Sequence, residues 1–326
     1  MRILRGWMLL VAACWLISGT AFAGKFIETV RIQDGAVTNS KITGPISAAK
    51  IEAGYFQTKH SNVVVVAKSG GDFTDINNAM LSIRDLANRD NPYLIKVMPG
   101  VYHMGASGCS LSDFISLEGS GKESTIFEID PYWSTVGTRS VALRINGESA
   151  VRNLSIKFIN ETPGNQYWRA HLTAIEINSA NAVVENVAIQ MPDNRYCEDR
   201  FGVKVINGGV ELRNVTGCGM KDFLYLENSQ ARVDNCRTNA CSGITLLIDD
   251  GGSYSYDIVN SSFGRLTFDA ANGAVSSMLK NVTVQDLVVM YNAQVTAAHS
   301  QIGALNNIGG EVKFFGCYDN ELNPIN

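Results

Sequence analysis

A short motif, VVENVAI at residues 183–189, recurs along the chain and is the strongest indication of its fold. Each copy is a β-type segment with an asparagine near its centre, followed by a turn rich in Gly, Asn or Ser. The copies are AVRNLSI at 150–156, VVENVAI at 183–189, VELRNVTGC at 210–218, ARVDNCRT at 231–238, YDIVNSSF at 256–263 and SMLKNVTV at 277–284. A repeat of about 20 to 30 residues made of short strands is typical of a solenoid.

The repeat predicts an all-β parallel β-helix in which each copy contributes to one coil. Successive coils of such a helix stack at ~4.8 Å, and their Val, Ile and Leu side chains point inward. We expect Val184, Leu212 and Ile258 to be inward residues. The shared asparagines are expected to stack at one bend of every coil and to hydrogen-bond the backbone of the neighbouring turn. They are Asn153, Asn186, Asn214, Asn235, Asn260 and Asn281. Glycosylation of those within Asn-x-Ser/Thr sequences is the alternative interpretation.

The first 23 residues have the pattern of a secretory signal peptide. Arg2 and Arg5 precede an apolar run, and Ala-Phe-Ala at 21–23 supplies small residues before a cleavage point at Gly24. A lipoprotein signal ending at Cys14 is the alternative, and the apolar run is short for a retained membrane anchor. The pattern predicts a secreted, periplasmic or cell-surface protein with no membrane span.

Residues 24–60 differ from the repeat region and are predicted to form an extended stalk or a linker. This segment lacks the apolar content for a core of its own, and it is a candidate for oligomer formation. A flexible spacer is the alternative. The β-helix domain is expected over 61–326. A helix near 75–88, with Thr74 or Asp75 as its N-cap, is expected to cap the first coil.

Composition narrows the function classes. Hydrophobic residues make up 45% of the 326-residue chain, which excludes a disordered protein. The formal net charge of −4 argues against a nucleic-acid partner and against docking on anionic lipid.

Cysteines and carboxylates suggest further sites. Six cysteines follow the signal peptide, and an even number in an exported protein suggests disulfides. Cys218–Cys241 and Cys197–Cys218 are alternative pairings, each about one coil apart. The histidines are scattered, so no structural metal is expected. A calcium site at Asp193, Glu198 and Asp199 is the only metal alternative, and these residues are more typical of a solvated turn.

The opening of the repeat region resembles the pectinesterase family. The resemblance rests on VVVVAKSGGDFTDINNAM at 63–80, IKVMPGVY at 95–102 and SLEGSGKESTIFE at 116–128. It implies a right-handed parallel β-helix of the pectin-lyase type. It is similar also to exported bacterial β-helix proteins that share this opening without established esterase activity.

The family's catalytic motifs are only partly present. The resemblance places the family's acid/base aspartate at Asp222 and its oxyanion-stabilising Gln at Lys221. The family's nucleophilic aspartate should fall near Gly243, where the sequence has no carboxylate. Arg265 is only a weak match to the family's arginine motif. Asp249 and Asp250 resemble a polygalacturonase pair without its histidine partner. Covalent ester hydrolysis needs a nucleophile, an acid and an oxyanion stabiliser together.

The sequence therefore favours a non-catalytic, exported β-helix that binds polysaccharide or a cell-surface glycan. A divergent carbohydrate esterase or lyase is the alternative, favoured by Asp222. Lys221 is expected to favour the ionised form of Asp222. Aromatic residues in turns are expected to bind sugar faces, with packing onto the solenoid as their alternative role. They are Tyr132, Trp133, Tyr167, Trp168 and Tyr196.

Overall fold

The computed structural model describes residues 62–131, 139–159, 170–192, 197–238, 243–247 and 252–325. All of these residues belong to one compact unit, which spans Thr58–Asn326. The predicted signal peptide and stalk lie outside the described residues and stay predictions, as does the boundary at residue 61.

The described residues form one helix and a long series of strands. The helix is α2 (Ile76–Ile83). The strands are β1 (Asn62–Val66), β2 (Tyr93–Val97), β3 (Gly100–His103), β4 (Cys109–Leu111), β5 (Ile115–Glu118), β6 (Thr125–Ile129), β7 (Arg139–Ile145), β8 (Ser149–Phe158), β9 (Ala170–Asn178), β10 (Asn181–Gln190), β11 (Cys197–Ile206), β12 (Gly209–Arg213), β13 (Thr216–Cys218), β14 (Asp222–Glu227), β15 (Gln230–Asp234), β16 (Arg237–Thr238), β17 (Gly243–Leu247), β18 (Ser253–Val259), β19 (Ser262–Lys280), β20 (Thr283–Ala298), β21 (Gln301–Ile308), β22 (Glu311–Phe315), β23 (Cys317–Tyr318) and β24 (Pro324–Ile325).

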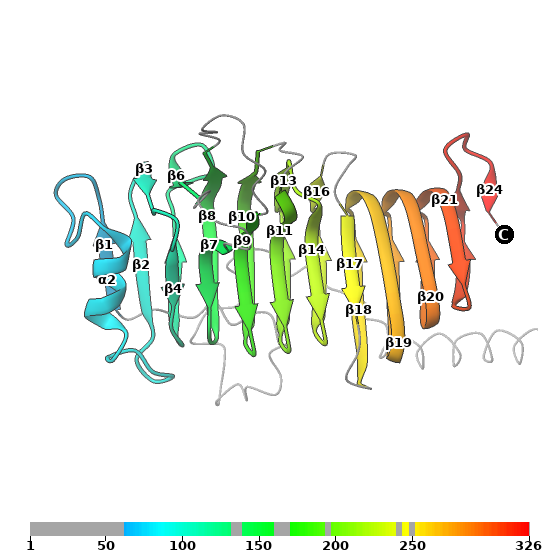
Figure 1. Ribbon diagram of the computed structural model, residues 1–326, viewed down its shortest axis with the longest axis horizontal. Coiled ribbons are helices and arrows are strands. Elements are labelled where there is room, and N and C mark those ends of the chain that lie inside the picture. Colours follow the sequence, from blue (N-terminus) through cyan, green and yellow to red (C-terminus); the bar gives the residue numbers. More distant parts are fainter. Residues whose placement is uncertain are drawn as a thin grey trace, which may run out of the picture. The chain divides into compact units, whose positions relative to one another are not determined.

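Parallel pairing joins these strands into three rows. Row 1 is β1–β2–β5–β8–β10–β12–β15–β18–β19–β20–β22. Row 2 is β3–β6–β8–β10–β13–β16–β19–β20–β21–β23. Row 3 is β4–β7–β9–β11–β14–β17–β19–β20–β21. Long strands such as β8 and β19 turn a corner and serve more than one row. The fold is a right-handed parallel β-helix, as the sequence predicts (Figure 1).

Aliphatic side chains stack in register inside the coils. Val184 pairs with Leu212, Leu212 with Val233, and Val233 with Ile258. Val184 and Leu212 are fully buried, and Ile258 is 1% exposed. The predicted inward orientation of these three residues is confirmed. Continuous burial of this kind stabilises each coil through its neighbours.

The predicted stacking of the asparagines is confirmed, at the bend between row 1 and row 2, but the amides described below donate to side chains of the neighbouring coil and not to its backbone. All six asparagines have a left-handed backbone, with φ between 51° and 58°. Asn tolerates this conformation better than most residues do. The Asn186 amide donates to Asn153 Oδ1 over 2.7 Å, and the Asn214 amide donates to Asn186 Oδ1 over 3.0 Å. Later in the helix Asn281 donates to Asn260, which itself donates to Asp234.

Helix α2 covers the first coil and lies beside β1 in Figure 1. Asp75 is the N-cap, because its Oδ1 accepts a hydrogen bond from the backbone N–H of Asn78 over 2.9 Å. The buried face is Ile76, Ala79, Met80 and Ile83. The helix ends at Ile83, so the predicted extension to residue 88 is wrong. Leu86 is 53% exposed there, although Ala87 still packs against the core.

The predicted disulfides are wrong for Cys218. Its thiol is free, as are those of Cys109, Cys236 and Cys317 among the described residues. Register explains the failure, because Gln190 stands opposite Cys218 in the preceding coil, where the sequence analysis expected Cys197. In the following coil Thr238 stands opposite Gly217, and Cys241 lies outside the described residues. In the described part of the chain, no helix is long and apolar enough to cross a bilayer.

Candidate functional site

Row 3 carries a column of aligned positions on its outer side. From one coil to the next they are Phe201, Asp222, Gly243, Arg265 and Asp286. The next residues inward are aliphatic, with Leu224, Ile244 and Leu266 buried in register. A β-bulge between Asp222 and Leu224 breaks the alternation there. Because a bulge re-aims the neighbouring side chain, Asp222 stays outside while Phe223 enters the core.

This column lies in a cleft of about 660 Å³ built by β11, β14, β17, β19 and β20. Two residues singled out from the sequence, Lys221 and Asp222, both line it. The cleft also holds two carboxylates that the sequence did not associate with Asp222, those of Asp199 and Asp286.

Asp222 is partly buried and hydrogen-bonded. The Thr245 hydroxyl donates to Asp222 Oδ1 over 2.7 Å. Burial raises the pKa of the Asp222 carboxyl above its usual value, and the charge of Asp199 acts in the same direction. The Thr245 hydrogen bond and the Lys221 charge lower this pKa but do not offset the burial. The Lys221 charge therefore acts in the expected direction, but burial outweighs it, so the expectation that Asp222 is a poor proton donor is wrong. A single sequence does not reveal the depth of burial that decides it.

Asp199 is the second carboxylate of the cleft. Its Oδ2 lies 2.8 Å from His171 Nδ1, and its Oδ1 lies 3.7 Å from Lys221 Nζ. Register aligns His171 with Asp199, so the pair links two adjacent coils. From the sequence, Asp199 is a candidate only for a calcium ligand. The available signal was its position 23 residues before Asp222, about one coil, but the irregular coil lengths made that spacing ambiguous.

Aromatic rings and a lysine form the wall beside Asp222. The Phe201 and Tyr225 rings lie 4.9 Å apart between centroids, at 47° to one another. Lys204 Nζ lies 5.2 Å from the Phe201 centroid and 5.0 Å from that of Tyr225. Burial lowers the pKa of Lys204, and the nearby Arg139 charge lowers it further. The cleft thus brings together an aromatic ring face, the partly buried lysine Lys204 and carboxylates.

Gly243 occupies the position where the family resemblance requires a nucleophile. A Cβ atom added there would lie 2.4 Å from the backbone oxygen of Arg265. The backbone therefore leaves no room for a side chain. Arg265, which matches the family's arginine motif only weakly in sequence, lines the same cleft and pairs with Asp286 over 3.5 Å. Because the coils here are about 21 residues long, Arg265 stands one coil after Gly243 and reaches the same cleft.

Several predicted residues lie outside the described residues. They are the aromatic residues Tyr132, Trp133, Tyr167, Trp168 and Tyr196, the pair Asp249 and Asp250, and the proposed calcium ligand Asp193. The side chain of Glu198 is likewise not described. Across the described ranges, no group of three or more His, Cys, Asp or Glu side chains could hold a metal ion.

Comparison with known proteins relates the chain by fold. The sequence matches no family model and no curated protein. Among solved structures, the catalytic domain of a GH87 α-1,3-glucanase in complex with nigerose aligns with 12% identity and a TM-score of 0.46, over 78% of this chain and 55% of the glucanase chain. Pectin methylesterase PemA from Erwinia chrysanthemi aligns with 14% identity and a TM-score of 0.45, over 77% and 81%. The Dettilon tailspike protein aligns with 10% identity and a TM-score of 0.46, over 78% and 60%. The chain is thus similar, over part of its length, to two enzymes and a tailspike protein, while its own strand pairing establishes the parallel β-helix.

Proposed function

We propose that this protein is an exported β-helix that binds a carbohydrate chain along the Asp222 cleft and does not hydrolyse esters through a covalent intermediate. The observation that carries the proposal is the combination of an accessible aromatic wall with a closed nucleophile position. The first gives a surface for sugar rings, and the second removes the family's covalent route.

The wall around Tyr225 supports carbohydrate binding. Sugar rings present apolar C–H faces that pack on aromatic rings, while their hydroxyls need hydrogen-bonding groups around the ring. Tyr225 is partly exposed, whereas Phe201 is only 8% exposed and supports it from behind. Lys221, at 60% side-chain exposure, lines the same cleft and can meet a hydroxyl or a carboxylate.

The surroundings of Gly243 argue against covalent catalysis. No side chain fits at that position, so the carboxylate nucleophile of the family pattern has no counterpart there. The described histidine of this region, His171, pairs with Asp199. The covalent route of the family therefore lacks its attacking group at Gly243.

Binding can be tested by titration calorimetry with a panel of oligosaccharides, including oligogalacturonides, alginate oligomers and glucan oligomers. Tyr225→Ala is expected to weaken binding of the preferred ligand about tenfold, because a ring contact of ~1–1.5 kcal/mol is lost. Tyr225→Phe keeps the ring and should retain most of the affinity. Phe315→Ala is the matched control, since Phe315 is 57% exposed and lies on β22, outside the cleft. Equal affinity of the wild type and Tyr225→Ala, or no ligand in the panel, would refute the proposal.

A glycoside hydrolase is the second candidate, and one observation favours it. Two carboxylates of one cleft have different surroundings, since Asp222 has a raised pKa while Asp199 lies against His171 and Lys221. Such a difference can assign one carboxyl as an acid and the other as a base.

The hydrolase alternative predicts reducing ends released from the bound oligosaccharide. Turnover should then be abolished in both Asp222→Asn and Asp199→Asn, with binding retained. Binding without any new reducing ends would leave the non-catalytic function standing.

A further inference from the structure

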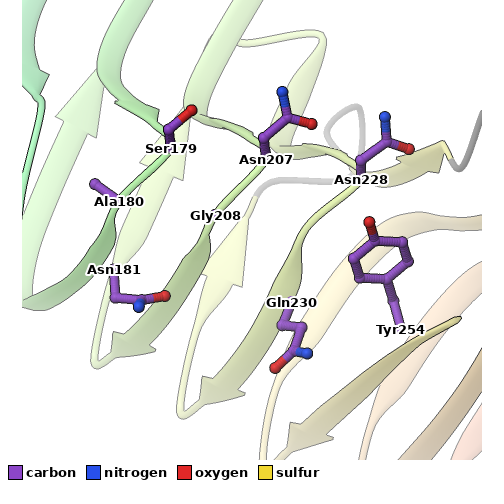
Figure 2. Close-up of a pocket in the computed structure, with 8 residues that line it drawn as sticks. All are labelled: Ser179, Ala180, Asn181, Asn207, Gly208, Asn228, Gln230 and Tyr254. Carbon is purple, nitrogen blue, oxygen red and sulfur yellow. The ribbon is translucent and has the colours of Figure 1, made fainter. Parts of the chain in front are cut away.

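A second hollow lies at the corner where row 3 ends and row 1 begins. Its volume is about 480 Å³. Three successive coils build it with equivalent tripeptides: Ser179–Ala180–Asn181, Asn207–Gly208–Gly209 and Asn228–Ser229–Gln230. Register fixes their equivalence, because Asn181 aligns with Gly209 and Gly209 with Gln230. We call this hollow the corner groove (Figure 2).

One side of the corner groove is a row of polar side chains. Ser179, Asn207 and Asn228 have φ values of 52°, 52° and 48°, and their side chains project in the same direction in Figure 2. The left-handed backbone alone accounts for asparagine at two of these positions. It does not account for Asn181 and Gln230, which begin β10 and β15 on the opposite side and are both exposed.

The floor between the two polar sides is formed by residues with small side chains or none. Ala180 and Ser229 are buried, and a Cβ atom at Gly208 would lie 2.3 Å from the backbone oxygen of Ala180. At Gly209 a Cβ atom would lie 2.5 Å from Asn181 Oδ1, so the missing side chain leaves room for the Asn181 amide. The Tyr254 ring bounds the groove beside Asn228 and Gln230.

The chemistry of the lining restricts what can bind. None of the side chains that line the groove is charged, so neither a carboxylate, a phosphate nor a metal ion would find a counter-charge there. An added peptide strand is also disfavoured, because the backbone is already used. The N–H groups of Ser179, Asn207, Gly209 and Gln230 all donate to neighbouring coils.

Amides and hydroxyls that both donate and accept are matched by ligand hydroxyls that do the same. A tyrosine ring beside them suits the apolar face of a sugar. We propose that the corner groove binds a neutral carbohydrate, whose hydroxyls meet Asn207, Asn181 and Gln230 across the coils and whose ring packs on Tyr254.

The corner groove is separate from the Asp222 cleft. No residue lines both sites, and along the chain the cleft residue Tyr225 on β14 and the groove residue Asn228 are three residues apart, roughly 10 Å. The inference therefore does not depend on the function proposed for the cleft, and each site can fail alone.

The test uses cellohexaose and maltohexaose as neutral probes and a hexagalacturonate as a charged one, titrated by ligand-observed NMR. The variants are Asn207→Gly, which keeps the positive φ while removing the amide, and Gln230→Ala, which trims an exposed side chain. Each should weaken binding of a neutral probe at least fivefold. The control is Asn281→Gly, the same change in the other asparagine ladder, which should bind normally. Melting temperatures identify any variant that is misfolded.

Tyr225→Ala separates the two sites. The proposal expects this cleft variant to bind the neutral probes as the wild type does. It is overturned if neither neutral probe binds the wild type at millimolar concentration. It is also overturned if neutral binding survives in Asn207→Gly and Gln230→Ala or is lost in Tyr225→Ala, which would assign the neutral probe to the cleft. Binding of hexagalacturonate that depends on Tyr225 alone would leave the cleft proposal intact.

Discussion

The two faces of row 3 follow different rules, although they are made by the same strands. On the inner face successive coils place a buried aliphatic side chain at the same position, and these side chains stack in register. They are Leu143, Ile175, Val203, Leu224, Ile244, Leu266 and Leu287. On the outer face the aligned positions change character at every coil, from Phe201 to Asp222, Gly243 and Arg265. Repetition therefore builds the solenoid, and departure from repetition builds the cleft.

The inner face is expected to tolerate charge least. Val184→Asp should lower the free energy of unfolding by several kcal/mol, because an unpaired carboxylate would enter a dry stack. Val183→Asp is the matched control, since the same substitution one residue earlier falls on the outer side, opposite Glu211, where Val183 is partly exposed. Urea denaturation followed by circular dichroism measures both. Similar midpoints for the two variants would show that the register is wrong.

The closed position on the outer face should resist an added side chain. Gly243→Asp is expected to destabilise by about 1–3 kcal/mol, because the backbone of Arg265 must move to accept a Cβ atom. It should not create esterase activity, although it supplies the carboxylate that the family pattern calls for. Thermal denaturation and a methanol-release assay check the two outcomes. A stable variant that hydrolyses methyl-esterified pectin would contradict the account of this position.

Substitution of an asparagine at the bend between row 1 and row 2 should lower the stability less, through the backbone conformation. Asn214→Ala is expected to cost about 1–2 kcal/mol, because alanine is strained at a φ of 53°. Asn214→Gly relieves the strain and loses chiefly the hydrogen bond to Asn186, so it should cost less. Equal loss in the two variants would mean that the side-chain ladder, and not the backbone conformation, selects asparagine.

The features that the sequence could predict are those that repeat from coil to coil or depend on local pattern, and the features it missed lie on the non-repeating outer face. The inward residues, the asparagine bend and the Asp75 cap were accessible because each depends on local pattern or on repetition. The meeting of Asp199 with Asp222, and the arrival of Arg265, depended on coil lengths that vary and on the bulge after Asp222. The disulfide prediction failed for that reason too, since one coil of separation does not guarantee register at Cys218.

The smallest effect concerns the pH dependence of stability at Asp222. Its raised pKa means that the folded protein favours the neutral carboxyl. The corresponding stability is fully present below the unfolded value of 3.8 and is lost as the pH rises through the folded value. Asp222→Asn stays neutral, so it should melt at a higher temperature than the wild type at pH 7 and at the same temperature at pH 3.

Asp286→Asn serves as the control for that measurement, because Asp286 is 49% exposed in the same cleft and pairs with Arg265. It should give no gain at pH 7. A gain for Asp222→Asn that is as large at pH 3 as at pH 7 would show that burial of its charge is not the cause.

Proton NMR of methyl-esterified oligogalacturonide mixed with the protein tests binding and catalysis in one experiment. Saturation transferred from the protein to sugar protons reports binding, and a methanol singlet reports ester hydrolysis. The proposed function predicts saturation transfer that weakens in Tyr225→Ala, with no methanol signal over time. A methanol signal that grows with the wild type and disappears in Asp222→Asn would contradict it and establish an esterase.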